Sequence, residues 1–198
     1  MGNVDTLKPW FRLVRLPNLL TVPGDPVAGY LLAAAAGTTP AEPLALFAAA
    51  GASLCLYVFG LILNDVVDIE VDRCERPERP LPAGEIAVPQ ARMAAIAMAL
   101  SGLNLALVGG RPALCVAAAL AGTVVLYNAW LKRVPVAGLI AMGLCRGLSL
   151  LLGATAAQPA LFRTCDAAAL PVFVAAAVVT LHVAGFSAVA KREMDPER

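Results

Sequence analysis

Charged and aromatic residues are scarce in this sequence. Only 15% of its 198 residues are charged and 6% are aromatic, and the net charge at pH 7 is +1. With one histidine and no Cys-x-x-Cys pair, the chain shows no zinc-ligand pattern. The five cysteines are an odd number, and we interpret them as reduced, small hydrophobic residues. The small net charge points to no partner class, and we expect no nucleic-acid partner.

Hydrophobic residues make up 60% of the chain, and the mean hydropathy is +0.77. This composition is typical of proteins that cross a membrane several times. A spanning helix needs ~20 largely apolar residues, and we expect six, with Pro43, Pro112 and Pro135 at helix starts. The expected spans are Leu16–Ala36, Pro43–Val67, Val88–Val108, Pro112–Leu131, Pro135–Ala154 and Ala168–Ala190. The sequence therefore predicts an all-α, polytopic transmembrane helical bundle that forms one domain over residues 1–198.

The basic residues are distributed asymmetrically between the loops of this layout. Of the fifteen lysines and arginines, twelve fall in the terminal segments and in alternate loops, and only Arg111 and Arg163 fall in the others. Loops rich in lysine and arginine stay in the cytoplasm. We therefore expect an integral protein of the plasma (inner) membrane with both termini cytoplasmic, and we expect no signal peptide.

An acidic stretch, "NDVVDIEVDRCERPERPLPAG" (residues 64–84), follows the second apolar run directly. On a helix, the spacings of Asp65, Asp68 and Asp72 place them on one face, with Asn64 at its edge and Glu70 elsewhere. Like charges this close repel, so a cation must offset them. Magnesium prefers such oxygens together with phosphates. We therefore predict these four residues, Asn64 included and Glu70 excluded, as metal ligands. The alternative is a solvated helix end.

Arginines and prolines alternate just after the acidic face. Arg73, Arg76 and Arg79 lie in a stretch stiffened by prolines, where they could clamp phosphate oxygens. Their other role would be to anchor the loop in the cytoplasm.

Two charged residues fall at membrane depth. Arg146 lies near the middle of the fifth expected span, where an arginine is costly unless it faces a cavity or a partner. That partner is either a bound phosphate ester or an aspartate, and a buried structural pair is the alternative to a catalytic role. Asp25 lies between Pro23 and Pro26, which indicates a broken helix lining a cavity. Asp25 could bind a second substrate, balance the charge of Arg146 or have no role beyond its position in the kink.

The acidic stretch resembles the first aspartate motif of the UbiA superfamily of intramembrane prenyltransferases. That motif reads N-D-x-x-D-x-x-x-D, followed by an R-P-x-R-P-like segment. The matching positions are Asn64, Asp65, Asp68, Asp72, Arg76, Arg79, Pro80 and Gly84. "RLVRLPNLLTVPGDPVAG" is similar to the start of the family's first helix. "LYNAWLKRVPVAGLIAMGLCRGLSLLLG" resembles the middle of the branch called EboC-like.

The resemblance implies a helical bundle whose central cavity holds an isoprenoid diphosphate through aspartate-bound Mg²⁺. The prenyl group then passes to an aromatic or other small acceptor. Tyr127 and Lys132 in "YNAWLK" resemble the family's Y-x-x-x-K motif with one extra residue, although Lys132 could instead anchor the loop. The predicted catalytic residues are Asp65, Asp68 and Arg146. The predicted substrate-binding residues are Asn64, Arg76, Arg79, Tyr127, Lys132 and Asp25.

The expected chemistry agrees with these residue types. Magnesium and basic side chains stabilise a diphosphate leaving group, and an apolar cavity keeps water from an allylic cation.

The chain departs from the family pattern after the sixth span. A second aspartate motif is expected there, but the segment reads "VAGFSAVAKREMDPER", with Lys191 and Arg192 in place of acids. The family's last helices have no counterpart, so a second copy or a partner subunit could complete the bundle. A non-catalytic lipid-diphosphate binder or assembly subunit is therefore an alternative, and a small-molecule transporter is a third reading.

Overall fold

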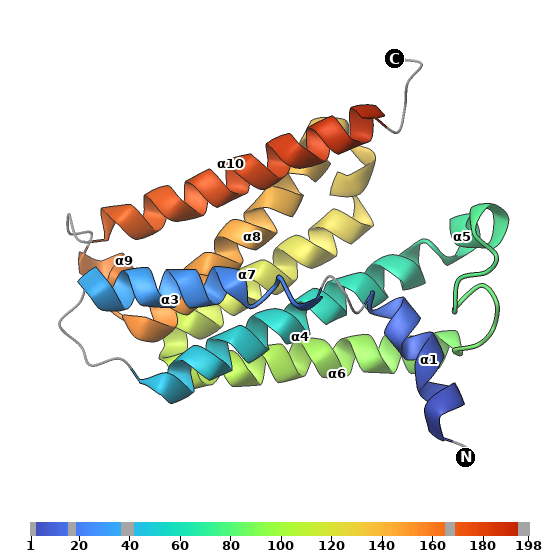
Figure 1. Cartoon of the computed structure of the whole chain (residues 1–198), viewed down its shortest axis with the longest axis horizontal. Coiled ribbons are helices and arrows are strands. Elements are labelled where there is room, and N and C mark those ends of the chain that lie inside the picture. The colour runs from blue at the N-terminus through green and yellow to red at the C-terminus, as the bar shows by residue number, and fades with distance from the viewer. Residues whose placement is uncertain (1–2, 16–18, 37–41, 165–168, 194–198) are drawn as a thin grey trace.

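The computed structural model describes residues 3–15, 19–36, 42–164 and 169–193, and within these ranges it contains helices and no strands. Figure 1 shows the long helices gathered side by side in a single bundle. This arrangement confirms the predicted all-α class. The α-helices are α1 (Asn3–Leu13), α3 (Gly24–Ala36), α4 (Pro43–Val67), α5 (Ile69–Glu75), α6 (Val88–Ala106), α7 (Gly110–Ala129), α8 (Pro135–Ala157), α9 (Leu161–Thr164) and α10 (Leu170–Glu193), and two 3₁₀ turns are η1 (Leu107–Gly109) and η2 (Leu131–Arg133).

Four segments of the described chain are long and apolar enough to cross a membrane. They are Pro43–Val67, Val88–Ala129, Pro135–Ala157 and Leu170–Ala190. The second has 42 residues and comprises α6 and α7, which run in opposite directions on either side of η1 (Figure 1). The chain is therefore an integral membrane protein with several spans. Helix α3, with 13 residues, is shorter than the ~20 that a full span needs.

Helix α8 is the centre of the bundle, because it packs against α3, α4, α7 and α10. Glycine allows its close approach to α3: a Cβ added at Gly153 would overlap the carbonyl of Pro26. Small residues at such crossings let helix backbones meet, which is how helices associate where no water drives them together.

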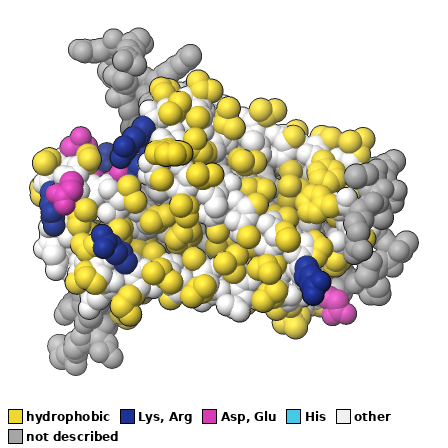
Figure 2. All heavy atoms as spheres, turned by 180° about the vertical axis from the view of Figure 1, so that it is seen from behind, with side chains coloured by type: hydrophobic (Ala, Val, Ile, Leu, Met, Phe, Trp, Pro, Cys, Tyr) yellow, Lys and Arg dark blue, Asp and Glu magenta, His cyan; other side chains and the backbone are white. Residues whose placement is uncertain are grey.

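The outer surface of the bundle is apolar. Figure 2 shows hydrophobic side chains over most of one face, with charged side chains close to its two ends. Large apolar side chains point outward from several helices, among them Leu44, Phe47, Met93, Ile96, Leu181 and Phe186. A surface of this kind suits lipid rather than water.

The sequence predicted most helix limits to within a few residues. Helix α4 has the predicted bounds, and α6, α7, α8 and α10 differ from prediction by a few residues at either end. The predicted helix Leu16–Ala36 is broken beside the prolines that indicated a break, with turns at residues 20–23 and α3 starting at Gly24. Residues 16–18 lie outside the described ranges. The prolines explain the late start: Pro23 and Pro26 lack an N–H, and a helix tolerates this only in its first turn.

One end of the bundle carries the polar elements. Helices α1 and α5 and the last turns of α10 lie at the same end of the molecule (Figure 1). The acidic stretch and the loop that follows it are therefore at this end, next to the last turn of α4.

Candidate functional site

The acidic stretch begins in α4 and continues into α5. Helix α4 ends at Val67, and Asp68 joins it to α5 with φ −89° and ψ 7°. The helical hydrogen bonding continues through this junction. The Asp68 N–H donates to the Asn64 carbonyl at 2.9 Å, and the Asp72 N–H donates to the Asp68 carbonyl at 2.8 Å. The motif side chains therefore keep an approximately helical spacing.

Asp65 and Asp72 are almost fully buried, and an arginine of the next loop bridges them. Arg79 Nη1 lies 2.6 Å from Asp72 Oδ2 and 3.6 Å from Asp65 Oδ1. Arg15 adds a second cation, 3.4 Å from Asp65, and Arg76 lies 3.9 Å from Asp72. Arginines thus balance both buried carboxylates, as such groups require.

Asn64 and Asp68 form a second pair, which meets a lysine from η2. Lys132 Nζ lies 2.6 Å from Asp68 Oδ1 and 3.4 Å from Asn64 Oδ1. The extra residue between Tyr127 and Lys132 does not move the lysine away, because α7 ends at Ala129 and the chain tightens into η2. The structure therefore brings Lys132 to the motif, and its predicted role in substrate binding stays a prediction.

The four predicted metal ligands meet two different cations, and their role as metal ligands stays a prediction. Arg79 draws Asp65 and Asp72 together, whereas Asn64 and Asp68 face Lys132, because these cations reach the helix from separate elements. Within the described ranges, no three His, Cys, Asp or Glu side chains are grouped to hold a metal ion. The four predicted ligands thus form two pairs rather than one set. Glu70 does point away, with its side chain 76% exposed.

The loop that carries Arg79 is anchored on both sides. Gly84 has φ +73°, a backbone conformation that favours glycine, at the turn that closes the loop. Ile86 is 2% exposed and joins the core. Arg12 of α1 donates to Glu85 at 2.9 Å. This anchoring holds Arg79 against the acidic face.

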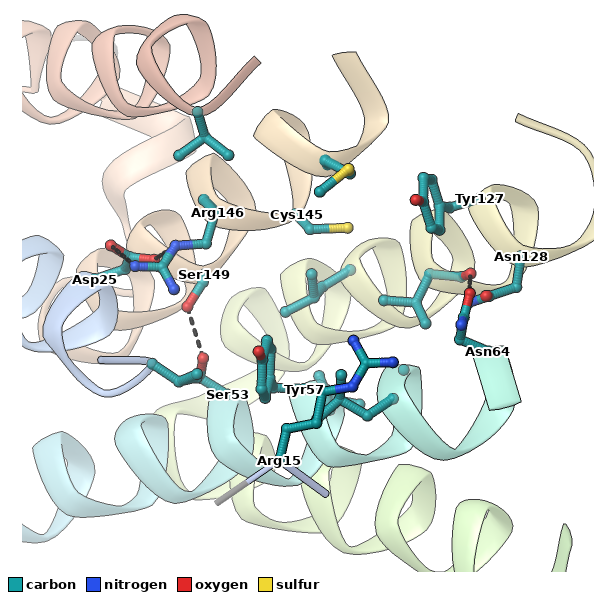
Figure 3. Close-up of a pocket in the computed structure, with 18 residues that line it drawn as sticks. Arg15, Asp25, Ser53, Tyr57, Asn64, Tyr127, Asn128, Cys145, Arg146 and Ser149 are labelled. Carbon is teal, nitrogen blue, oxygen red and sulfur yellow. Dashed lines mark hydrogen bonds and ion pairs between the residues drawn. The ribbon is translucent and has the colours of Figure 1, made fainter. Parts of the chain in front are cut away.

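A cavity of about 380 Å³ extends from this polar end into the bundle. Figure 3 shows Asn64, Tyr127 and Asn128 near one end of it and the Asp25–Arg146 pair near the other. The lining comes from α3, α4, α7, α8 and α10, with Arg15 and Val22 from the segments before α3: Arg15, Val22, Asp25, Ser53, Leu56, Tyr57, Gly60, Leu61, Asn64, Leu120, Val124, Tyr127, Asn128, Met142, Cys145, Arg146, Ser149 and Val183. Most of this lining is apolar, so the cavity suits a hydrocarbon chain.

Arg146 pairs with Asp25 deep in the cavity. Arg146 Nε lies 2.6 Å from Asp25 Oδ2, and Nη2 donates to Oδ1 at 3.2 Å. Of the roles left open for Asp25, the structure shows the one that balances Arg146. The hydroxyls of Ser53 and Ser149 are hydrogen-bonded to each other at 2.6 Å and line the same cavity (Figure 3). The catalytic role predicted for Arg146 stays a prediction.

The sequence did not identify several cavity residues. The distribution of basic residues indicates only a membrane anchor for Arg15, and no sequence motif assigns a role to Tyr57 or Asn128. The signal for Asn128 was present, because Leu120, Val124 and Asn128 repeat at the helical interval and share the face that lines the cavity. The side chains of Lys191 and Arg192, where the second motif was expected, lie outside the described residues.

The fold and the motif match known proteins. The sequence profile of the UbiA prenyltransferase family matches residues 26–198. A digeranylgeranylglyceryl phosphate synthase of Methanoculleus marisnigri is 34% identical over 150 residues, which cover 75% of this chain and 51% of that protein. The synthase of the same name from Methanothrix thermoacetophila is 30% identical, over 75% of this chain and 54% of that protein. The chain thus spans about half the length of these curated relatives.

Solved structures of other proteins have the same fold. A structure of digeranylgeranylglyceryl phosphate synthase superimposes with a TM-score of 0.81 at 26% identity, over 98% of this chain and 65% of that one. A UbiA homolog from Archaeoglobus fulgidus bound to GPP and Mg²⁺ superimposes with a TM-score of 0.73 over 96% of this chain and 65% of that one. The two sequences are 19% identical, so the similarity shows a shared fold only. The resemblance to the EboC-like branch stays a prediction. On the profile match and the shared bundle, this chain belongs to the UbiA prenyltransferase family.

Proposed function

We propose that this chain is a membrane prenyltransferase that moves an isoprenoid group from a prenyl diphosphate to a small acceptor, with Mg²⁺ as cofactor. The observation that carries the proposal is that Asn64 and Arg15 line one end of an apolar cavity and also contact Lys132 and Asp65 of the neighbouring charged pairs. A prenyl diphosphate has the same division, with a charged head and a hydrocarbon tail.

The names of the relatives support a choice of acceptor. They are named for digeranylgeranylglyceryl phosphate, an isoprenoid ether of glycerol phosphate. We extend this chemistry to the present chain and propose an alkylglyceryl phosphate with a free hydroxyl group as the acceptor. An aromatic acceptor, which the wider family suggested, is the alternative to be tested beside it.

The oxygen pairs offer two positions for a cation. The Lys132 ammonium contacts both Asn64 and Asp68, and the Arg79 guanidinium approaches both Asp65 and Asp72. Each contact marks a point where one positive group meets two oxygens. Magnesium is commonly held by one or two carboxylates together with substrate phosphates, so these residues fit it. When bound, Mg²⁺ would neutralise charge on the diphosphate leaving group.

The basic side chains have a direct role in this proposal. Lys132, Arg15 and Arg79 present N–H donors at the polar end, where they can bind diphosphate oxygens and stabilise the charge that develops as the C–O bond breaks. Arg76 has a half-exposed side chain and would assist from the rim. The apolar walls, with Leu56, exclude water from the prenyl cation.

Transfer by the purified chain in lipid nanodiscs tests the proposal. We expect a radiolabelled prenyl group from geranyl or geranylgeranyl diphosphate to appear on the alkylglyceryl phosphate only when Mg²⁺ is present. A panel with an aromatic acceptor separates the two acceptor classes. Transfer that continues with excess chelator would contradict the Mg²⁺ assignment.

A lipid-diphosphate binder without turnover is the second candidate. The absence of any grouping of three acidic, His or Cys side chains in the described ranges favours it, because fewer ligands hold fewer ions. Magnesium-dependent binding of the diphosphate without any transfer product would select this reading.

A further inference from the structure

Asn128 has an unusual environment for an amide side chain. It is 2% exposed, lies in the penultimate position of α7 and lines the cavity beside Tyr127 (Figure 3). Its Oδ1 has no hydrogen-bond partner among the residues that the structure describes. Buried polar atoms are nearly always paired, so an unpaired one on a cavity wall points to a ligand.

The hydrogen bonding of Asn128 fixes which of its atoms is free. Its Nδ2 donates to the Val124 carbonyl at 2.9 Å. A carbonyl only accepts, so a flipped amide would set two oxygens against each other. The unpaired atom is therefore the acceptor Oδ1, whose complement is an O–H or N–H donor or a metal ion. The oxygens of a fully ionised diphosphate only accept, so Asn128 does not complement the diphosphate head.

We infer that Asn128 binds the hydroxyl group of the acceptor substrate, with Oδ1 accepting a hydrogen bond from the O–H that is to be prenylated. The inference rests on the proposed prenyl transfer. The residues proposed above bind the diphosphate, and Asn128 is a further residue that binds the acceptor.

This geometry suits the reaction. With the hydroxyl hydrogen held by Oδ1, the lone pairs of the hydroxyl oxygen are free to attack. That oxygen forms the new C–O ether bond, and the bond between the prenyl carbon and the diphosphate breaks with its electron pair on the diphosphate. A neutral amide is too weak a base to keep the proton, which passes to the released diphosphate. Asn128 therefore orients the acceptor and does not act as the base.

The test compares two probes that differ by one oxygen: an alkylglyceryl phosphate with a free hydroxyl, and its deoxy analogue. Binding of each to the chain in nanodiscs is measured by calorimetry without any diphosphate. A hydrogen bond to a buried acceptor predicts about 10-fold tighter binding of the hydroxyl probe by the wild-type protein. Asn128→Leu, which keeps the volume, should reduce this ratio to about 1.

Two further variants control the experiment. Asn104 on α6 is exposed, makes the same bond to the carbonyl four residues earlier at 2.8 Å and does not line the cavity. Asn104→Leu should leave the ratio unchanged. Asn128→Asp keeps an acceptor oxygen at this position, so it should keep the preference even if Asn128→Leu folds poorly.

The outcomes are distinct. A wild-type protein without preference for the hydroxyl probe, or Asn128→Leu with the preference intact, overturns the inference. So does a loss of preference in Asn128→Asp. If the preference behaves as expected but no prenyl transfer is found in the presence of Mg²⁺, the proposed activity fails and the hydroxyl site stands.

Discussion

At the scale of single residues, an isolated charge in a membrane interior is costly, and Asp25 and Arg146 reduce this cost by pairing with each other. Their side chains are 13% and 29% exposed and contact each other at 2.6 Å. Removing one partner leaves the other charge buried and uncompensated, whereas removing both leaves an apolar wall.

We therefore predict different stabilities for single and double substitutions of this pair. Arg146→Leu should lower the free energy of unfolding by about 3–5 kcal/mol. Asp25→Leu combined with Arg146→Leu should recover most of that loss. Thermal unfolding in detergent measures both. A single variant as stable as the wild type would contradict the pairing, and a stable double variant without activity would support the catalytic role predicted for Arg146.

The residues of the site were only partly predictable from sequence. The spacing of Asp65, Asp68 and Asp72 gave the correct helix, but it could not show that cations from a loop and from η2 divide them into two pairs. Arg15 was read as an anchor because basic residues near a membrane usually are anchors. The role of Asn128 could not be predicted from the sequence, because it depends on the cavity, which forms only when α7 packs against α4 and α8.

At the scale of secondary-structure elements, the contact between α3 and α8 positions Asp25 against Arg146. Gly153 faces the backbone of Pro26 with no space for a side chain. The fixed distance between these helices is therefore a condition for the ion pair.

Gly153→Ala should separate the two helices and destabilise the protein by about 1–3 kcal/mol through overpacking. Gly122 in α7 is a matched control, because a Cβ there meets nothing within 4 Å. Gly122→Ala should be neutral or stabilising by up to about 1 kcal/mol, since alanine favours the helix. Thermal unfolding of the two variants side by side measures the difference. Equal effects would mean that α3 and α8 are not in close contact.

Hydropathy and proline positions predicted these elements because long apolar runs leave few alternatives to a helix. Helix α4 has the predicted limits, Pro43–Val67, for this reason. For the first predicted span, Pro23 and Pro26 indicate a break, but hydropathy still predicts a segment long enough to cross the membrane. The chain instead turns before Gly24 and starts a helix that is too short to span alone.

At the scale of the whole molecule, the positions of the charged loops determine orientation in the membrane. Helices α1 and α5 and the last turns of α10 share one end of the bundle (Figure 1). The segments at this end contain most of the basic residues, which favours a cytoplasmic location.

A reporter fused after Arg198 tests this orientation. We predict that an alkaline phosphatase fusion, which needs export to fold, is inactive, and that a green fluorescent fusion is bright. The same pair of fusions placed after Gly110, at the opposite end of the bundle, should give the reverse result. An active phosphatase at Arg198 would invert the proposed topology.

The most direct test of the central claim, that the acidic face at the cavity end holds the diphosphate, is magnesium-dependent prenyl transfer by two isosteric variants. Asp68→Asn removes a charge next to Lys132, and Glu70→Gln removes one from the exposed side of the same segment. We predict that Asp68→Asn lowers kcat/KM by about 100-fold or more, as the loss of one electrostatic contact to a leaving group does. Glu70→Gln should stay within about 2-fold, because an exposed pair contributes little. Equal losses in both variants, or full activity in Asp68→Asn, would contradict the account.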